Sequence, residues 1–146
     1  AGVVLMHMQG SPRTMQRAPS YRNVRDEVAE FLRQRLDDCI SLGIDPDCLA
    51  LDPGIGFGKT VEHNLTLLGS LEQLAIGDRP LILGVSRKSF IGKLLGSDEM
   101  ADREWPTVAL TSYARSHGAR VFRVHEPLPN LHAMRMTEAI CHAADH

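Results

Sequence analysis

The chain has 146 residues, 43% of them hydrophobic, which is enough for one domain with a buried core. Its formal net charge is −2 and it contains no basic run, so the composition argues against a nucleic-acid surface. No apolar segment approaches the roughly 20 residues that span a membrane, and no signal peptide precedes the first apolar strand, so we expect a cytoplasmic protein. The three cysteines lack metal-binding spacing and are expected to be reduced thiols.

Strand and helix patterns alternate from the beginning of the chain. The first strand is expected over residues 3–8 and is followed by a polar loop and a helix over about 22–42. A second strand is expected over 48–52 and a second helix over about 62–75. The chain starts directly with an apolar strand and has no initiator Met, so we expect it to be a fragment.

The same alternation continues through the second half. A third strand over 81–85 runs into a short helix that ends at Gly96, and a further helix is expected over about 105–117. A fourth strand over 121–124 precedes a last helix over about 129–143. Repeated strand–helix units of this kind predict the α/β class with a parallel sheet.

The stretch 49–60 reads Leu-Ala-Leu-Asp-Pro-Gly-Ile-Gly-Phe-Gly-Lys-Thr. Its apolar start is typical of a parallel strand covered on both faces, which places Asp52 at the carboxyl end of that strand. Ligands bind at this end in parallel α/β folds. The three glycines permit positive φ, and Lys59 adds a cation. The alternative is a tight turn in which Asp52 caps the following helix.

All four predicted strands end in polar side chains. These side chains are His7 and Gln9, Asp52, Ser86 to Ser89, and Arg123 with His125. Because the carboxyl ends of parallel strands meet at one edge of a sheet, we expect them to form a binding site there.

Arg123 and His125 are two positions apart and are expected to project on the same side of one strand. A guanidinium beside an imidazole suits an oxyanion such as phosphate or pyrophosphate. The alternative is an ion pair with Glu126 or Asp102.

The sequence Ser86-Arg87-Lys88-Ser89 follows an apolar strand and opens a helix. Ser89 is therefore expected near a helix N-terminus, where free N–H groups favour an anion. Lys88 is placed to donate to a ligand heteroatom, whereas Arg87 could equally be a solvated surface residue. For Ser86 and Ser89 the alternative role is helix capping.

Met6 and Phe57 are apolar residues of the kind that fill a core, yet each could instead form a wall for a flat ring.

Other nucleotide and catalytic motifs do not fit. A phosphate-binding P-loop needs Gly where Pro53 stands, and the Rossmann glycine spacing fails in the same stretch. Neither H-E-x-x-H nor G-x-S-x-G occurs. Pro53 therefore argues against a nucleotide hydrolase, while a non-catalytic α/β module that binds a phosphate ligand remains an alternative.

Four motifs together resemble dihydropteroate synthase, and they occur in that family's order. They are Leu-Met-His-Met-Gln-Gly (5–10), Leu-Asp-Pro-Gly-Ile-Gly-Phe-Gly-Lys (51–59), Gly-Val-Ser-Arg-Lys-Ser (84–89) and Arg-Val-His (123–125). The resemblance implies a TIM (β/α)₈ barrel that joins 6-hydroxymethyl-7,8-dihydropterin pyrophosphate to p-aminobenzoate in folate biosynthesis. It further implies that residues 1–146 are the C-terminal half of that barrel, strands five to eight, with the N-terminal half absent and the isolated chain inactive.

The resemblance also implies roles for single residues. Asp52 would accept the paired N–H edge of the pterin, and Lys88 would contact both the pterin and the p-aminobenzoate pocket. Ser89 would hold the carboxylate of p-aminobenzoate. Arg123 and His125 would bind the pyrophosphate leaving group and act in catalysis together with Lys88.

The remaining implied contacts are apolar. Met6 and Phe57 would pack on the pterin and near the p-aminobenzoate ring, with Gly56 in the turn beside them. The resemblance implies Mg²⁺ in the full enzyme, with its Asn ligand and two further pterin-binding residues in the missing half, so we expect no metal ligand in this chain.

A half barrel leaves two parallel sheet edges unpaired, which is unfavourable in water. We therefore expect a homodimer, unless the chain is one piece of a nicked enzyme. One departure from the family pattern is Glu126, where Asp is common, and we expect little effect from it.

Overall fold

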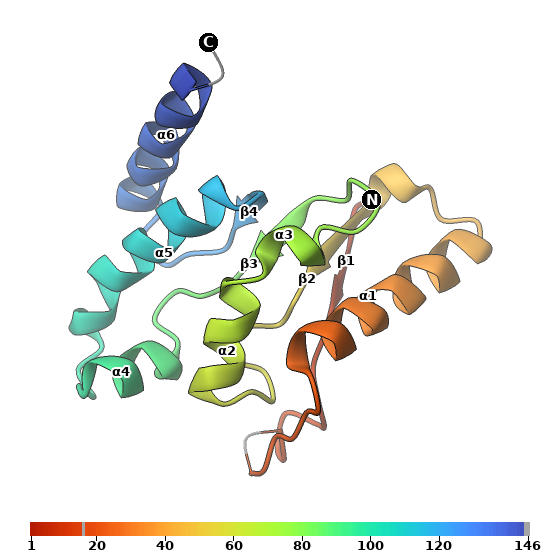
Figure 1. Cartoon of the computed structure of the whole chain (residues 1–146), viewed down its shortest axis with the longest axis horizontal. Coiled ribbons are helices and arrows are strands. Elements are labelled where there is room, and N and C mark those ends of the chain that lie inside the picture. Colours follow the sequence, from red (N-terminus) through yellow and green to blue (C-terminus); the bar gives the residue numbers. More distant parts are fainter. Residues whose placement is uncertain (16, 145–146) are drawn as a thin grey trace.

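A computed structural model describes residues 1–15 and 17–144 and contains one four-stranded parallel sheet (Figure 1). The strands lie in chain order, with each one hydrogen-bonded to the next. They are β1 (Val3–Met6), β2 (Leu49–Asp52), β3 (Leu81–Leu83) and β4 (Ala119–Phe122).

Helices follow every strand. They are α1 (Val24–Ser41), α2 (Val61–Leu68), α3 (Leu71–Leu74), α4 (Ser89–Leu95), α5 (Glu104–Ser116) and α6 (Pro127–Ala144), with two short 3-10 turns at Pro46–Cys48 and Ala101–Arg103. Four successive strand–helix units in one parallel sheet are half of a (β/α)₈ barrel. The predicted fold class is confirmed.

Local signals explain where the helices begin and end. The side chain of Asn23 accepts the N–H of Asp26 and starts α1, and Gly96 ends α4 at φ 68°. The single helix predicted over 62–75 is wrong, because the chain breaks at Gly69 and Ser70 into α2 and α3. The break keeps four leucines buried around the turn: Leu67, Leu68, Leu71 and Leu74.

The fourth strand begins earlier than the sequence pattern predicted. Gly118, two residues after the end of α5, adopts φ 92°, so β4 starts at Ala119, and the β3–β4 ladder shifts register between Leu81 and Ile82. Arg123 and His125 therefore lie in the loop after β4 and not on the strand. The backbone of Arg123 still donates to Leu83 O at 2.9 Å.

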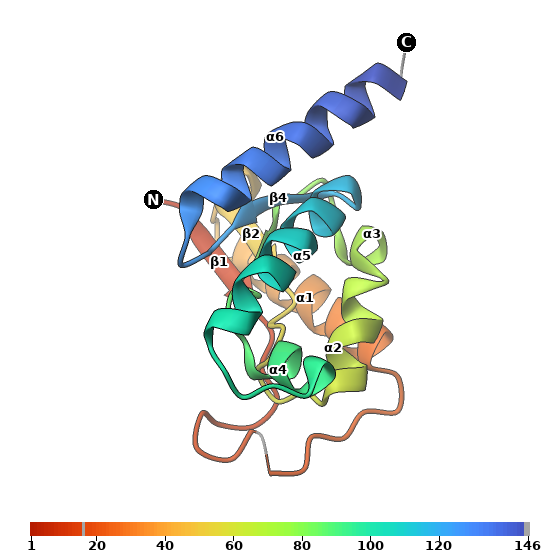
Figure 2. The ribbon, with the colours of Figure 1, turned by 90° about the vertical axis from the view of Figure 1, so that its left-hand side faces the viewer.

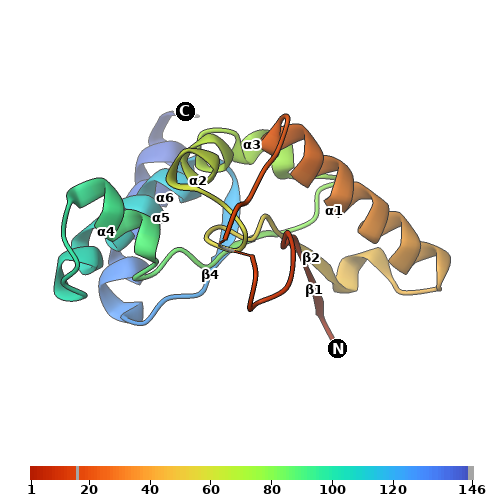
Figure 3. The ribbon, with the colours of Figure 1, turned by 90° about the horizontal axis from the view of Figure 1, so that it is seen from below.

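The two faces of the sheet differ in burial. Leu51 and Leu83 are fully buried among the helices, which form an arc on one side of the strands (Figure 3). The opposite face carries Met6, Asp52 and Ile82 in adjacent register positions, and Met6 is 37% exposed. Coverage of the second strand, predicted from its apolar run, holds for Leu49, Leu51 and Asp52, which are buried, while Ala50 is only partly buried.

Helix α6 packs along α5 and extends past the rest of the chain at the C-terminal end (Figure 2). In the described residues, none of the helices has the length and apolar character needed to cross a membrane. Cys39, Cys48 and Cys141 are all free thiols.

Candidate active site

Asp52 occupies the end of β2 on the open face of the sheet. Its side chain is only 7% exposed, and Oδ1 accepts the N–H of Gly54 at 2.7 Å. That contact is the tight turn considered as an alternative, but Asp52 does not cap the next helix, since Thr60 is the N-cap of α2. Within the described residues, the second carboxylate oxygen has no hydrogen-bond partner and keeps its capacity to accept.

Three cations surround this carboxylate. Burial raises the pKa of Asp52, opposed by the Gly54 N–H and by the charges of Lys88, Arg123 and Lys59. Burial lowers the pKa of Lys59 to about 7 and that of Lys88 to about 8, against the attraction of Asp52. One negative and three positive side chains give the strand ends an excess of positive charge, which favours an anionic ligand.

Lys88 extends across the glycine turn that follows β2. Its Nζ donates to Ile55 O and lies 4.2 Å from the centroid of the Phe57 ring, a cation–π contact. A Cβ on Gly56 would come 2.7 Å from Lys88 Cδ, and Gly56 has φ 81°. Gly56 thus leaves space for Lys88, and Phe57 is partly buried.

Lys59 lies beneath the same turn, a position that the sequence did not predict. It is 4% exposed, and its Nζ is 3.0 Å from each of three acceptors, Gly54 O, Phe57 O and His7 Nδ1. Gly56 leaves room for Lys88, whereas Lys59 holds the turn together from inside. The sequence held one indication that Lys59 is buried, because the segment around it is glycine-rich and otherwise apolar.

Arg123 and His125 face the loop after β3. Both are exposed, and the absence of a side chain at Gly84 makes room for Arg123, because a Cβ there would lie 2.6 Å from its guanidinium. His125 Nδ1 is 2.8 Å from Ser86 Oγ. Helix capping by Ser86 is therefore wrong, since its hydroxyl serves His125.

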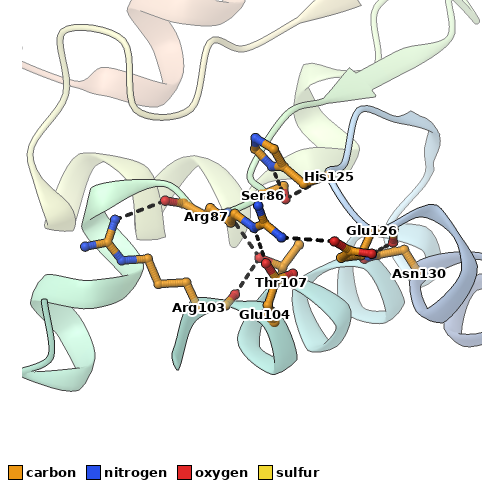
Figure 4. A network of polar contacts seen from close by, with 8 residues as sticks. All are labelled: Ser86, Arg87, Arg103, Glu104, Thr107, His125, Glu126 and Asn130. Atoms are coloured by element: carbon orange, nitrogen blue, oxygen red, sulfur yellow. Dashed lines mark hydrogen bonds and ion pairs between the residues drawn. The ribbon is translucent and has the colours of Figure 1, made fainter. Parts of the chain in front are cut away.

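Arg87 is part of a polar network and is not a solvated surface residue (Figure 4). It has φ 58°, and its guanidinium pairs with Glu104 and, at 3.1 Å, with Glu126. The ion pair considered between Glu126 and Arg123 or His125 is wrong, because Glu126 turns to Arg87. The alternative partner, Asp102, accepts instead from Ser97 Oγ at 2.6 Å.

The last two expected contact residues also lie at this edge. Ser89 is exposed and is the first residue of α4, directly after the N-cap Lys88, as predicted from the helix start. Met6 ends β1 in register with Asp52. The structure therefore brings together side chains from all four strand ends.

The described residues do not fit a magnesium site. Mg²⁺ prefers several oxygen ligands, and the strand ends offer one carboxylate, Asp52, among three cations. Within residues 1–15 and 17–144, no group of three or more His, Cys, Asp or Glu side chains could hold a metal ion. No chemical step at this edge of the sheet is assigned to a metal.

A parallel half barrel with a buried carboxylate and three cations at its strand ends defines an α/β protein built to bind a polar, anionic ligand. Residues 1–125 match the family described as pterin binding enzyme. The chain belongs to this family. The relatives found for it are dihydropteroate synthases, and the resemblance predicted from the four motifs is confirmed.

Two relatives show the extent of the match. The chain is 45% identical over 140 residues to dihydropteroate synthase of Neisseria meningitidis serogroup C, covering 95% of the chain and 50% of the relative. It is 41% identical over 143 residues to the Escherichia coli K12 enzyme, covering 98% of the chain and 50% of the relative. The chain spans about half the length of the curated relatives it matches.

Solved structures agree with this match. The Yersinia pestis dihydropteroate synthase in a sulfonamide drug complex superposes with a TM-score of 0.92 at 39% identity, over 97% of this chain and 52% of that one. The Xanthomonas albilineans enzyme in complex with 7,8-dihydropteroate gives a TM-score of 0.86 at 37% identity, over 95% and 50%. The same enzyme has been solved with 4-aminobenzoic acid.

Proposed function

We propose that residues 1–146 are the C-terminal half of a dihydropteroate synthase and carry much of its substrate pocket. The observation that carries the proposal is the buried Asp52 carboxylate in the field of Lys59, Lys88 and Arg123 at the strand ends. The complexes of the Xanthomonas albilineans enzyme with 7,8-dihydropteroate and 4-aminobenzoic acid support the substrate class.

Asp52 and Lys88 form the pterin side of the proposed pocket. The free carboxylate oxygen of Asp52 accepts from the aminopyrimidinone edge, while Gly54 holds the other oxygen. Lys88 interacts with that carboxylate and with the Phe57 ring, and in the proposed pocket it donates to the pterin and borders the p-aminobenzoate site. Met6 and Gly56 provide the apolar floor and the space around the ring.

The anionic ends of both substrates meet the remaining residues. Ser89, at the start of α4, holds the carboxylate of p-aminobenzoate. Arg123 and His125 bind the pyrophosphate. In the reaction, the bond between the pterin methylene carbon and the pyrophosphate oxygen breaks, pyrophosphate leaves with the electron pair, and the amine forms the new C–N bond and loses a proton. Arg123 and His125 stabilise the charge that develops on the leaving group.

The proposed partners of the chain follow from its open sheet. Val3 and Val4 of β1 and Val121 of β4 are 38%, 51% and 45% exposed, and β1 and β4 are the two edges of the sheet. We propose that they become covered in a homodimer. Sedimentation at several concentrations should show a dimer, and a monomer at all concentrations would contradict it.

Two further predictions concern the whole enzyme and its location. Magnesium, bound by the absent half, would be tested by metal analysis of the full barrel. A cytoplasmic location would be tested by cell fractionation.

Titration calorimetry tests the function of the chain. We expect binding of 6-hydroxymethyl-7,8-dihydropterin pyrophosphate, weaker binding of p-aminobenzoate, no comparable binding of ATP, and no formation of dihydropteroate. Equal affinities for pyrophosphate, ATP and the pterin substrate would favour the non-catalytic phosphate-binding module instead. Robust synthesis of dihydropteroate by the isolated chain would contradict the proposal that the catalytic site is incomplete.

A further inference from the structure

The loops that follow β3 and β4 contact each other at successive positions. Arg123 donates its backbone N–H to Leu83 O at 2.9 Å, and its guanidinium occupies the space left by Gly84. Two residues further along, Ser86 and His125 form the next contact, with Ser86 Oγ 2.8 Å from His125 Nδ1. The orientation of the imidazole is therefore set from the neighbouring loop, 39 residues away in sequence.

The hydrogen bonds of the Ser86 hydroxyl determine which ring nitrogen of His125 carries the proton. Ser86 is 8% exposed, and its oxygen accepts the backbone N–H of His125 at 3.2 Å. Within the described residues, Nδ1 of His125 is the one acceptor within hydrogen-bond distance of this buried hydroxyl, so the hydroxyl donates its single hydrogen to Nδ1, which then accepts. A neutral imidazole that accepts at Nδ1 carries its hydrogen on Nε2.

The second ring nitrogen is directed away from Ser86 and Arg87. Figure 4 shows one nitrogen of His125 turned to Ser86 and the other turned away from the network. Within the described part of the chain, no hydrogen-bond partner occurs at Nε2, and the residue is exposed. An Nε2–H group in this position can donate to a ligand beside the strand ends.

We propose that Ser86 is a positioning residue that holds neutral His125 in the Nε2–H tautomer, so that His125 donates to an oxyanion without needing to be protonated. Only the identity of that oxyanion, pyrophosphate, rests on the proposed function. The network around Arg87 holds Ser86 in place: the Arg87 backbone N–H donates to Thr107 Oγ1 at 3.3 Å, and its guanidinium pairs with Glu104 and Glu126.

The tautomer is measured directly by NMR. Long-range ¹H–¹⁵N correlation spectra of the ¹⁵N-labelled chain are recorded about two pH units above the ordinary imidazole pKa, with His125 assigned from a His125→Gln spectrum. We expect one tautomer with the proton on Nε2. Ser86→Ala should give a mixture of tautomers, and Ser86→Thr, which keeps the hydroxyl, should restore the single one.

Ser116→Ala is the matched control, because Ser116 Oγ lies 3.1 Å from Nδ1 of His117, the C-cap residue of α5. This variant should leave the His125 signals unchanged. An Nδ1–H tautomer in the unmodified chain, or the same Nε2–H population in Ser86→Ala, overturns the proposal. If Ser86→Ala does not fold, the tautomers of His125 in the unmodified chain and in Ser86→Thr still decide whether the proposal is correct.

A separate titration with inorganic pyrophosphate distinguishes the two levels of inference. If the role of Ser86 is correct, Ser86→Ala binds pyrophosphate about tenfold more weakly than the unmodified chain, the loss of one well-oriented hydrogen bond. Equal affinities in the two proteins, together with a changed tautomer, would contradict the role of His125 as an oxyanion donor. Absence of pyrophosphate binding in both, with the tautomer as expected, contradicts the proposed function and leaves the positioning role supported.

Discussion

The ammonium of Lys59 lies 3.0 Å from Nδ1 of His7, and both side chains are buried although 52 residues separate them. The same Nζ donates to Gly54 O and Phe57 O, so its three hydrogens match three acceptors. Through these contacts Lys59 joins the end of β1 to the turn that carries Asp52. The turn is held from below by a lysine that is 4% exposed.

Lys59→Met should lower the free energy of unfolding at pH 7 by about 2–4 kcal/mol, because buried acceptors lose their donor. Between about pH 7 and 10.5, Lys59 is protonated in the unfolded chain but not in the folded one, so the unmodified chain gains stability as the pH rises. Lys59→Met lacks this group, so the difference in unfolding free energy between the two proteins should widen over this range. Urea unfolding at several pH values measures both effects. Lys93→Met, on the exposed surface of α4, is the control, and equal midpoints for the two variants would contradict the role of Lys59.

His7 should make the fold sensitive to acid. Burial, followed by the charge of Lys59, lowers the pKa of His7 from 6.5 to about 4. Between these values the unfolded chain binds a proton that the folded chain does not, so stability falls as the pH decreases through this window, by up to about 3 kcal/mol. We expect His7→Asn, which keeps an acceptor for Lys59, to unfold with a shallower pH dependence. A slope as steep as that of the unmodified chain would show that other groups cause the acid sensitivity.

Gly54→Ala should destabilise the fold by more than about 3 kcal/mol. A Cβ at Gly54 would lie 1.8 Å from the backbone oxygen of His7, which cannot move without disturbing the sheet, and the residue has φ 68°. Gly43→Ala is the matched control, since Gly43 has φ 85° with no atom within 4 Å of the added Cβ. Its cost should be only the backbone strain, about 1–2 kcal/mol. Similar losses in the two variants would mean that the close approach to His7 is unimportant.

Asp52→Asn should weaken binding of the dihydropterin substrate about 100-fold while the turn stays intact. The Asn oxygen can still accept from Gly54, but its NH₂ group faces the donor edge of the pterin. Calorimetric titration gives the affinity, and circular dichroism checks the fold. Asp47→Asn is the control, because Asp47 is an exposed carboxylate that pairs with Arg79, and this variant should bind the dihydropterin substrate normally. Unchanged affinity in Asp52→Asn would remove the proposed pterin contact.

The Arg87–Glu126 ion pair should contribute less than about 1 kcal/mol. The Glu126 side chain is 56% exposed, so solvent screens the pair, and the shorter side chain in Glu126→Asp should change stability little. A double-mutant cycle of Arg87→Met and Glu126→Gln measures the coupling from unfolding midpoints. A coupling above about 2 kcal/mol would show that Glu126 does more than hold a loop.

Much of the fold could be predicted because its signals are local. The alternation of apolar strands with helices, the stop at Gly96 and the polar ends of four strands are all visible in the sequence. The break at Gly69 and Ser70 was missed, because an unbroken leucine spacing continues through it. The early start of β4 was missed as well, since it depends on the backbone of Gly118 and on pairing with β3.

The candidate site divides in the same way. Asp52, Lys88, Arg123 and His125 were predicted because each ends or follows an apolar strand. The partners of Lys59, Ser86 and Arg87 were not predicted, because they are 52, 39 and 39 residues away, at the ends of other strands. No spacing rule in a single sequence shows such contacts.

By itself, the sequence determined the class of fold, the edge of the sheet where the polar strand ends meet and the family to which the chain belongs, since short motifs and residue periodicity carry this information. Only the tertiary structure decided which side chains touch. The packing of the strands and loops placed Lys59 under the turn of Asp52 and directed Glu126 to Arg87. It also brought the Ser86 hydroxyl within hydrogen-bond distance of His125. The physical reason is that hydrogen bonds and ion pairs require distances of about 3 Å, which depend on the register of strands brought together by folding.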